Sequence, residues 1–284
     1  MAEQLIISNN MIRASISTIG AQLTSIKKDG AEVLWDGNPD VWAGQAPIVF
    51  PICGGLRDDR FDFEGKSYNL EKHGFIRKSE FSVESKTDDS ATLIYKSNSE
   101  TLKHYPFDFE FRVSYKIVDN KVEITYETKN TGCKTMYFSV GGHEGYAIEG
   151  DIEDYTVVFE KSETLNAKVL NGNLLEYKTV PILENSNELK LKDEFFSVDA
   201  LVFADLNSRK VTLRGDKNGK SLSVEFDGFD YFLLWKKFGA KYICIEPWCG
   251  IQDYVDSNYD ITKKRGIIAL KAGETDRRVH SVIL

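Results

Sequence analysis

The chain of 284 residues is long enough to bury an extensive hydrophobic core, and all-β chains of this length often form one domain. Its formal net charge of −8 argues against a nucleic-acid partner, because proteins of that class present a basic face to the phosphates. The four cysteines show neither C-x-x-C spacing nor the density of a disulfide scaffold, so we expect reduced thiols and no metal site.

The sequence carries no recognisable signal for export or for a membrane. Residues 1–13 lack the basic segment and the long apolar run of a signal peptide. No other stretch approaches the roughly 18 apolar residues of a membrane-spanning helix. We therefore expect a cytoplasmic protein without a membrane partner.

The predicted elements are mostly short β-strands in which apolar and polar residues alternate. In chain order, the first turn signals come at residues 28–30 and 64–65, and each contains a glycine between two such stretches. Residues 97–106 could form one short helix. That helix would end at Pro106, because proline lacks the amide hydrogen that a helix interior needs.

The clearest hairpin signal lies in the middle of the chain. Apolar residues alternate with polar ones over 109–117 and again over 122–126, and Asp119-Asn120 between them favours a tight turn. Similar signals predict a hairpin around 217–219 and two last strands around 272–273.

Many short strands without intervening helices indicate an all-β fold. No linker, charged tail or internal repeat divides the chain. We therefore predict one domain over residues 1–284, built as a large antiparallel β-sandwich. A large sandwich commonly has a concave sheet face, which is a natural place for a ligand.

Two of the four histidines lie in glycine-rich surroundings. His73 precedes Gly74 and is followed four residues later by Arg77. His143 lies in FSVGGHEGY after an apolar strand, where glycines allow a bulge or the close approach of a ligand. A structural role would also explain either histidine taken alone.

Three charged residues lie at the ends of predicted strands. Glu246 follows the apolar strand YICI and lies two residues before Trp248, so its carboxylate must be either desolvated or paired. Arg57 follows two glycines, and Asp199 opens an apolar strand. A salt bridge would also explain Glu246, a surface position would explain Arg57, and a strand cap would explain Asp199.

Taken together, these segments give the chain a specific family resemblance. It resembles the aldose 1-epimerase (galactose mutarotase) superfamily, and most of all the LacX-like branch. The resemblance rests on five segments in the order FPICGGLRDD, KHGFIR, SVGGHEGY, DALVF and CIEPWCG, and it runs from near Ile7 to the last strand. It implies a β-supersandwich, in agreement with the periodicity.

The resemblance also implies roles for the residues that match the family's motifs. The family uses a glutamate base and a histidine acid, which match Glu246 and His143. A second histidine that contacts the sugar matches His73. An arginine and an aspartate that bind sugar hydroxyls match Arg57 and Asp199. The substrate would be a small sugar, with no cofactor and no metal.

The implied reaction is exchange of the α and β anomers of a hexose. A base removes the proton of the C1 hydroxyl, an acid protonates the ring oxygen, and the opened chain closes on its other face. A nearby carboxylate favours the protonated form of an imidazole, so we expect Glu246 ionised and His143 protonated. We also expect the two groups to face each other across a space as wide as one pyranose.

Other residues near these motifs would bind the rest of the sugar. Trp248 and Phe75 are candidates for stacking on a sugar face. Arg77, with Lys78 beside it, could hold a phosphate through charge-assisted hydrogen bonds. Glu144 departs from the family pattern directly after the histidine, where the choice of sugar would be set.

The sequence leaves three alternatives open. One is a hexose-6-phosphate mutarotase, with the same chemistry on a charged sugar. Another is a sugar-binding protein that has lost catalysis, although an acid–base pair exceeds what binding alone needs. A glycosidase or lyase would need two carboxylates, and only Glu246 and Asp199 are available. Free strand edges would allow either a monomer or a homodimer.

Overall fold

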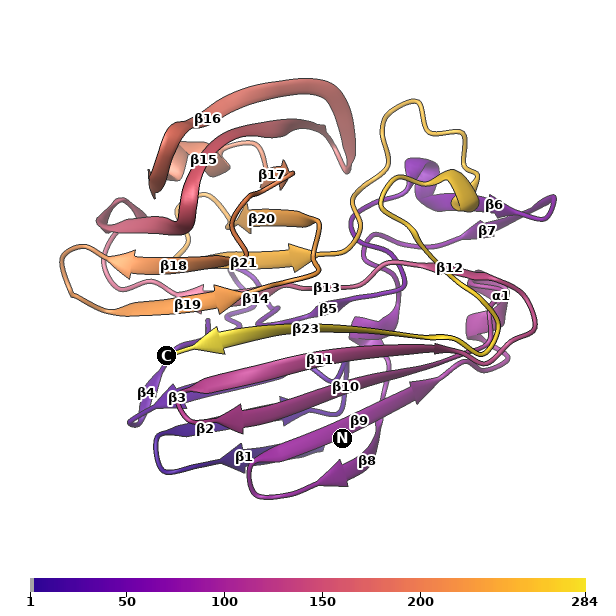
Figure 1. The fold of residues 1–284 in the computed structure, drawn as a ribbon, viewed down its shortest axis with the longest axis horizontal. Helices are drawn as coiled ribbons and strands as arrows, with labels where there is room; N and C mark the ends of the chain where they lie inside the picture. The colour runs from indigo at the N-terminus through magenta and orange to yellow at the C-terminus, as the bar shows by residue number, and fades with distance from the viewer. Residues whose placement is uncertain (1–2) are drawn as a thin grey trace.

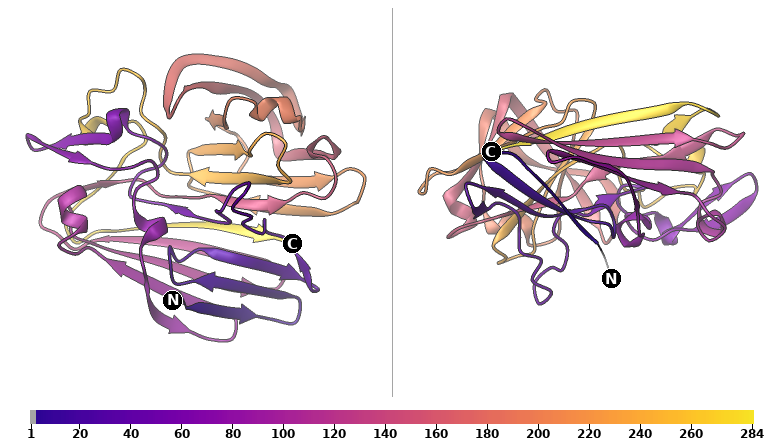
Figure 2. Two further views of the ribbon diagram at one scale, coloured as in Figure 1. Left: turned by 180° about the vertical axis from the view of Figure 1, so that it is seen from behind. Right: turned by 90° about the horizontal axis from the view of Figure 1, so that it is seen from below.

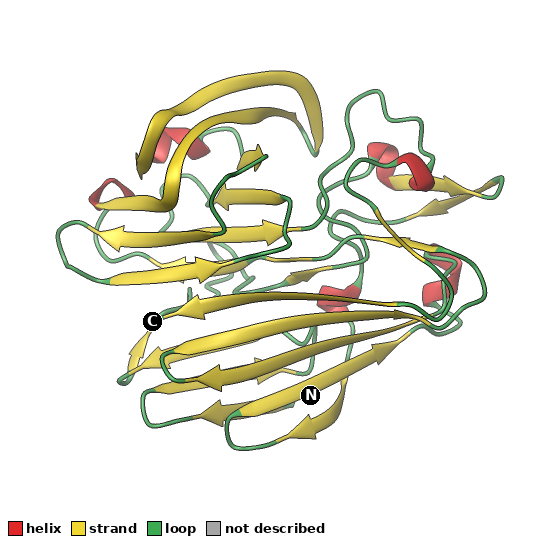
Figure 3. Ribbon diagram, viewed as in Figure 1, coloured by secondary structure: helices red, strands yellow, loops and turns green. Residues whose placement is uncertain are grey.

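The structure, a computed structural model, describes residues 3–284, and most of its regular structure is β-sheet (Figure 3). The strands of the first half are β1 Gln4–Ser8, β2 Ile12–Ser17, β3 Leu23–Lys28, β4 Ala31–Glu32, β5 Ile48–Val49, β6 Arg60–Phe63, β7 Lys66–Asn69, β8 Ser82–Lys86, β9 Ser90–Lys96, β10 Phe109–Val118, β11 Lys121–Asn130 and β12 Met136–Phe138. Those of the second half are β13 Gly141–Gly142, β14 Glu144–Ala147, β15 Tyr155–Asn171, β16 Leu174–Lys190, β17 Leu201–Ala204, β18 Lys210–Gly215, β19 Ser221–Glu225, β20 Tyr231–Trp235, β21 Tyr242–Trp248, β22 Ile268–Leu270 and β23 Thr275–Ile283.

Helical structure is sparse in this part of the chain. The α-helix α1 spans Thr101–His104 and ends before Pro106, inside the stretch where the sequence predicts a short helix. The 3₁₀ helices are Arg57–Asp59, Ile76–Lys78, Ile152–Asp154, Asp193–Phe196 and Ile261–Lys263. None of the helices in residues 3–284 has the length and apolarity to cross a membrane.

One large antiparallel sheet runs through the whole molecule (Figure 1). Its strands follow the order β5-β13-β21-β20-β17-β15-β18-β19-β23-β11-β10-β9-β8, with β14 also paired to β21 and β16 to β15. A second sheet, β1-β2-β3-β4, lies against the half that contains β8–β11, and the two form stacked layers (Figure 2). The predicted all-β sandwich is confirmed.

The core between these layers explains why the alternating stretches fold as they do. Along β10, every second residue from Phe109 to Ile117 is buried, and the residues between them are mostly half-buried. Phe111 stacks on Phe50 with ring centroids 4.2 Å apart, and the Tyr115 hydroxyl donates to the carbonyl of Ala21 across the layers. Period-two burial thus fixes which face of each strand meets the core.

The predicted turns are mostly confirmed. Asp119-Asn120 joins β10 to β11, and the turns at 28–30, 64–65 and 217–219 join β3 to β4, β6 to β7 and β18 to β19. The two strands predicted around 272–273 are also present, as β22 and β23, but they do not pair with each other. Instead β22 pairs with β12, while β23 lies between β11 and β19.

The other end of the large sheet carries a ligand-sized hollow. Strand β21 lies between β20 on one side and β13 and β14 on the other, and the next neighbour of β20 is β17. The long hairpin β15–β16 arches over this end (Figure 1). Its tip is tied down where the Leu175 amide donates to the carbonyl of Asp253.

Candidate active site

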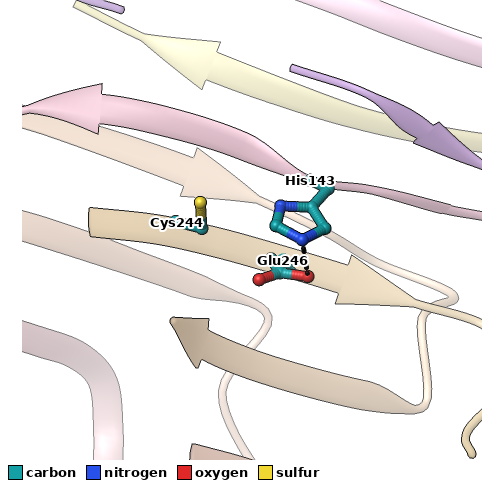
Figure 4. A group of neighbouring side chains, drawn as sticks. All are labelled: His143, Cys244 and Glu246. Atoms are coloured by element: carbon teal, nitrogen blue, oxygen red, sulfur yellow. Dashed lines mark ion pairs between the residues drawn. The ribbon is translucent and has the colours of Figure 1, made fainter. Parts of the chain in front are cut away.

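His143 and Glu246 are cross-strand neighbours at the centre of this hollow. Gly141 is paired with Trp248, and Glu144 with Ile245, in one continuous register. That register puts His143 directly opposite Glu246, where side chains on one face of a sheet are in contact range. The His143 Nε2 and Glu246 Oε2 atoms are 3.5 Å apart (Figure 4).

This arrangement differs from the expected one in its geometry. The two groups lie side by side on adjacent strands and do not face each other across the width of a sugar ring. Side-by-side placement still suits the implied chemistry. The C1 hydroxyl oxygen and the ring oxygen are bonded to the same carbon, so neighbouring groups can reach both.

A cavity of about 330 Å³ opens over this pair, within the size range of small-molecule sites. It combines aromatic walls with several titratable groups. Its lining consists of Trp42, Pro47, Val49, Lys72, His73, Arg77, His143, Asp199, Ala200, Leu233, Trp235, Glu246, Trp248 and Gln252.

The cavity also gathers buried polar atoms that have no hydrogen-bond partner among residues 3–284. These atoms are Arg77 Nε, His143 Nδ1, Glu246 Oε1 and Gln252 Oε1. Leaving a buried polar group unpaired costs about 1–3 kcal/mol, so proteins rarely retain such groups without a use. Four of the nine such atoms among these residues belong to side chains that line this cavity, where a polar ligand would pair with them.

Glycines of the His143 segment make room for the side chains that shape the cavity. A Cβ on Gly141 would come within 2.3 Å of Trp248 Cδ1, and one on Gly145 within 2.8 Å of Trp42 Cζ3. The Trp248 indole also donates to the carbonyl of Gly142. Gly141 and Gly145 are therefore explained by the close packing of two indoles against this segment.

Trp42 and Trp235 hold the His143 ring in place. The Trp42 ring stacks on the imidazole with centroids 5.3 Å apart, and Trp235 meets it edge-on at 5.4 Å. The sequence reasoning missed both tryptophans. Trp42 lies in an irregular segment without periodicity, and Trp235 reads as an ordinary strand residue, so no local pattern singled them out.

His73 faces His143 from the other side, with ring centroids 5.7 Å apart. Its Nδ1 accepts a hydrogen bond of 3.3 Å from the backbone amide of Gly54. Burial, assisted by the nearby cationic groups, lowers the pKa of His73 well below its usual value. His73 is therefore neutral with its proton on Nε2, which makes it a hydrogen-bond donor.

Burial also decides the electrostatics of the central pair. Desolvation raises the pKa of Glu246 well above its usual value and lowers the pKa of His143 from 6.5 to about 3. This corrects the expectation that the carboxylate keeps the imidazole protonated. Glu246 is almost fully buried, so both groups favour their neutral forms in the free protein.

The other predicted contacts divide into residues inside and outside the cavity. Asp199, Arg77 and Trp248 line it, as the sequence led us to expect. Arg57 lies outside, because its guanidinium donates to the carbonyl of Ser257 and lies over the Tyr259 ring. Its role in binding sugar hydroxyls therefore stays a prediction from the sequence.

Two further expectations from the sequence also change. Phe75 packs against the core aromatic residues Tyr105 and Phe109 and does not line the cavity. The ammonium of Lys78 pairs with Glu71, 2.7 Å away, on the exposed surface. The lysine that lines the cavity is Lys72, six residues earlier.

One trio that includes the His143–Glu246 pair has the donor types of a metal site. His143, Cys244 and Glu246 have potential ligand atoms within 4.8 Å of one another, and Figure 4 shows them together. A metal-binding thiol must lose its proton. Burial raises the pKa of Cys244 well above its usual value, so in the free protein this thiol beside the pair keeps its proton.

Comparison with known proteins adds independent evidence. The family model described as Aldose 1-epimerase matches residues 3–280. The chain belongs to the aldose 1-epimerase family. Within the family it is 34% identical to the plasmid-encoded protein LacX of Lactococcus lactis subsp. lactis, over 98% of both chains.

Solved structures of similar proteins share the fold of this family member. A galactose mutarotase related enzyme from Lactobacillus acidophilus aligns with a TM-score of 0.94 at 35% identity, covering 99% of this chain and 97% of that chain. A galactose mutarotase-like protein from Lactobacillus casei ATCC 334 aligns equally well at 26% identity, covering 99% of each chain. The predicted membership of the aldose 1-epimerase family and its LacX-like branch is confirmed.

Proposed function

We propose that this protein is a mutarotase that interconverts the α and β anomers of a hexose, with Glu246 and His143 as its acid–base pair. The observation that carries the proposal is their cross-strand contact at 3.5 Å in the floor of a sugar-sized cavity. Membership of the aldose 1-epimerase family supports the reaction class.

The proposed chemistry needs only proton transfers. When the pair carries its one proton on His143, Glu246 removes the proton of the C1 hydroxyl while the C1–ring oxygen bond breaks, and His143 gives its proton to the ring oxygen. The C1 oxygen becomes the carbonyl of the open chain. Rotation about C1–C2 and the reverse proton transfers then close the ring as the other anomer, so atoms and charge balance.

The remaining cavity residues suit the binding of a neutral sugar. His73 presents a fixed donor, and Asp199 presents a carboxylate that accepts a bond from the amide of Ala200. Trp248 and Trp235 offer flat apolar faces of the kind on which sugar rings stack. A site that acted on water or on a small acid would need the acid–base pair but not these additional binding groups.

The main proposal is tested by replacing each member of the pair. Because one proton transfer typically contributes about 10²- to 10⁴-fold, Glu246→Gln and His143→Asn should each lower kcat by that order. NMR exchange spectroscopy or polarimetry on glucose and galactose measures the rate. Glu194→Gln is the matched control, since that exposed carboxylate lies outside the cavity. Full activity in Glu246→Gln would rule out the base.

A second candidate is the same reaction on a phosphorylated hexose. Arg77 and Lys72 bring two cationic groups to the cavity lining, and Arg77 Nε is buried without a partner among the described residues. Among residues 3–284, the ammonium group of Lys72 forms no ion pair. A phosphate would pair with both groups through charge-assisted hydrogen bonds.

Replacement of Lys72 separates the two candidates. If the substrate is phosphorylated, Lys72→Met should raise KM for glucose 6-phosphate about tenfold or more, because a charge-assisted hydrogen bond contributes about 1.5–3 kcal/mol. Its activity on free glucose should stay unchanged. The neutral hexose would remain the substrate if glucose and glucose 6-phosphate gave equal kinetics in the wild type and again in Lys72→Met.

A further inference from the structure

Gln252 is a cavity residue that neither the sequence motifs nor the acid–base chemistry uses. It lies four residues beyond the end of β21, in the irregular segment that follows Cys249. Its side chain lines the cavity together with Glu246 and His143, although the residue is only 4% exposed. A buried carboxamide at a ligand cavity needs an explanation in terms of hydrogen bonding.

The carboxamide oxygen of Gln252 has no hydrogen-bond partner among the described residues. Within residues 3–284, this Oε1 atom is buried and accepts no hydrogen bond. An amide can use up to four hydrogen bonds, two as donor and two as acceptor. An unpaired buried polar group costs about 1–3 kcal/mol, so the site keeps this amide at the expense of stability.

Local packing leaves room for this side chain at the cavity. A Cβ on Gly54 would come within 2.2 Å of Gln252 Cγ and 2.8 Å of Cδ, so only a glycine lets the side chain lie there. The same Gly54 donates its amide hydrogen to His73 Nδ1. One glycine therefore positions both His73 and Gln252 at the cavity.

The backbone next to Gln252 is also held firmly. The carboxylate of Asp253 pairs with Lys264 at 2.8 Å, and it accepts the amide of Arg57 at 3.0 Å. Both members of that ion pair are about 95% buried. A residue held in this way is pre-organised, so binding costs less conformational entropy.

We propose that Gln252 is a specificity-determining residue that hydrogen-bonds a ring hydroxyl of the sugar away from C1. The inference rests on the proposed function, since it takes the ligand to be a sugar whose C1 oxygens are served by Glu246 and His143. A neutral amide suits this task because it both donates to and accepts from a hydroxyl. A carboxylate there would add a further acidic group to a cavity that already contains Glu246 and Asp199.

The test combines Gln252→Met with a set of monodeoxy hexoses. Methionine has a similar length but no polar amide, so Gln252→Met keeps the volume and the fold. In the wild type, one deoxy sugar should lose about five- to tenfold in kcat/KM, since a hydrogen bond contributes about 1 kcal/mol. In Gln252→Met, the parent sugar should lose the same factor and that deoxy sugar should lose nothing further.

Gln4→Met is the control, because it makes the same change on exposed strand β1 outside the cavity. Independent, multiplicative losses for every deoxy sugar would overturn the proposal, as would full activity of Gln252→Met on the parent sugar.

Sugar binding, followed by NMR titration, gives a readout that does not require turnover. If the wild type binds hexoses but does not exchange their anomers, the proposed function fails while the Gln252 coupling is still measured in Kd. If it shows neither binding nor exchange with any hexose in the set, both proposals are overturned.

Discussion

The His143–Glu246 pair, in the form that we propose to be active, shares a single proton. With the proton on His143, the charged pair can open a sugar ring. With the proton on Glu246, the neutral pair can close the open chain, because the acid then protonates the C1 oxygen and the imidazole deprotonates the ring hydroxyl. Burial favours this neutral arrangement in the free protein. The two arrangements have the same total charge, so the cycle never adds a net charge to the cavity.

The pH profile should reflect these shifted groups. Below a pH of about 3 both groups hold a proton, and above the raised pKa of Glu246 neither does. Between these limits the pair keeps its one proton, so kcat should stay level as pH falls through 6.5 and should decline on the alkaline side. Such limbs belong to the pair as a whole and not to either residue.

Anomer exchange measured by NMR over the acid and neutral range checks this profile, with stability followed in parallel by circular dichroism. An activity that halves near pH 6.5 on acidification, while the protein stays folded, would mean that the imidazole titrates as an exposed one does. That outcome would contradict the burial argument.

At the scale of elements, the segment from β13 to β14 is shaped by its contacts across the sheet. Gly142 admits the carboxylate of Glu144, since a Cβ there would come within 2.6 Å of Glu144 Oε2. Gly145 admits the ring of Trp42, which stacks on His143. The orientation of the imidazole therefore depends on a glycine two residues away.

Gly145→Ala tests this dependence. A Cβ 2.8 Å from Trp42 Cζ3 must displace the indole, so we expect a loss of stability of about 1–3 kcal/mol and a lower kcat with a smaller change in KM. Thermal unfolding and anomer exchange measure the two effects. Gly132→Ala is the control, because its Cβ would meet ordinary contacts of 3.4 Å or more. Unchanged kcat and melting temperature in Gly145→Ala would show that Trp42 does not fix the histidine.

How far the sequence predicts an element depends on how local its contacts are. The hairpin β10–β11 pairs residues close in sequence, so alternation and one turn were enough to predict it. The register of β14 against β21 joins distant segments, and no local pattern specifies it. The side-by-side placement of His143 and Glu246 could not be predicted for that reason.

The same reasoning applies to the individual site residues. His143 and Glu246 were found because strand ends and family motifs mark them. Gln252 and Trp42 lie in irregular segments, where only tertiary packing brings them to the cavity. The motif that contains Arg57 lies beside the site, but the Arg57 side chain turns toward Ser257.

At the scale of the whole molecule, β23 holds the two halves of the large sheet together. It pairs with β19 on one side and with β11 on the other. From this strand the His280 imidazole reaches the Glu144 carboxylate at 3.1 Å, and both side chains are buried. The last strand thus touches the residue that directly follows His143.

This placement of β23 has a consequence for how the protein folds during translation. Until the final strand leaves the ribosome, the sheet lacks its central connection and Glu144 lacks its buried partner. Because pairings between distant segments are slow to form, we expect the nascent chain to lack the finished cavity until β23 has been synthesised. The proposed sugar site would then be completed in one late step, when β23 docks between its two neighbours.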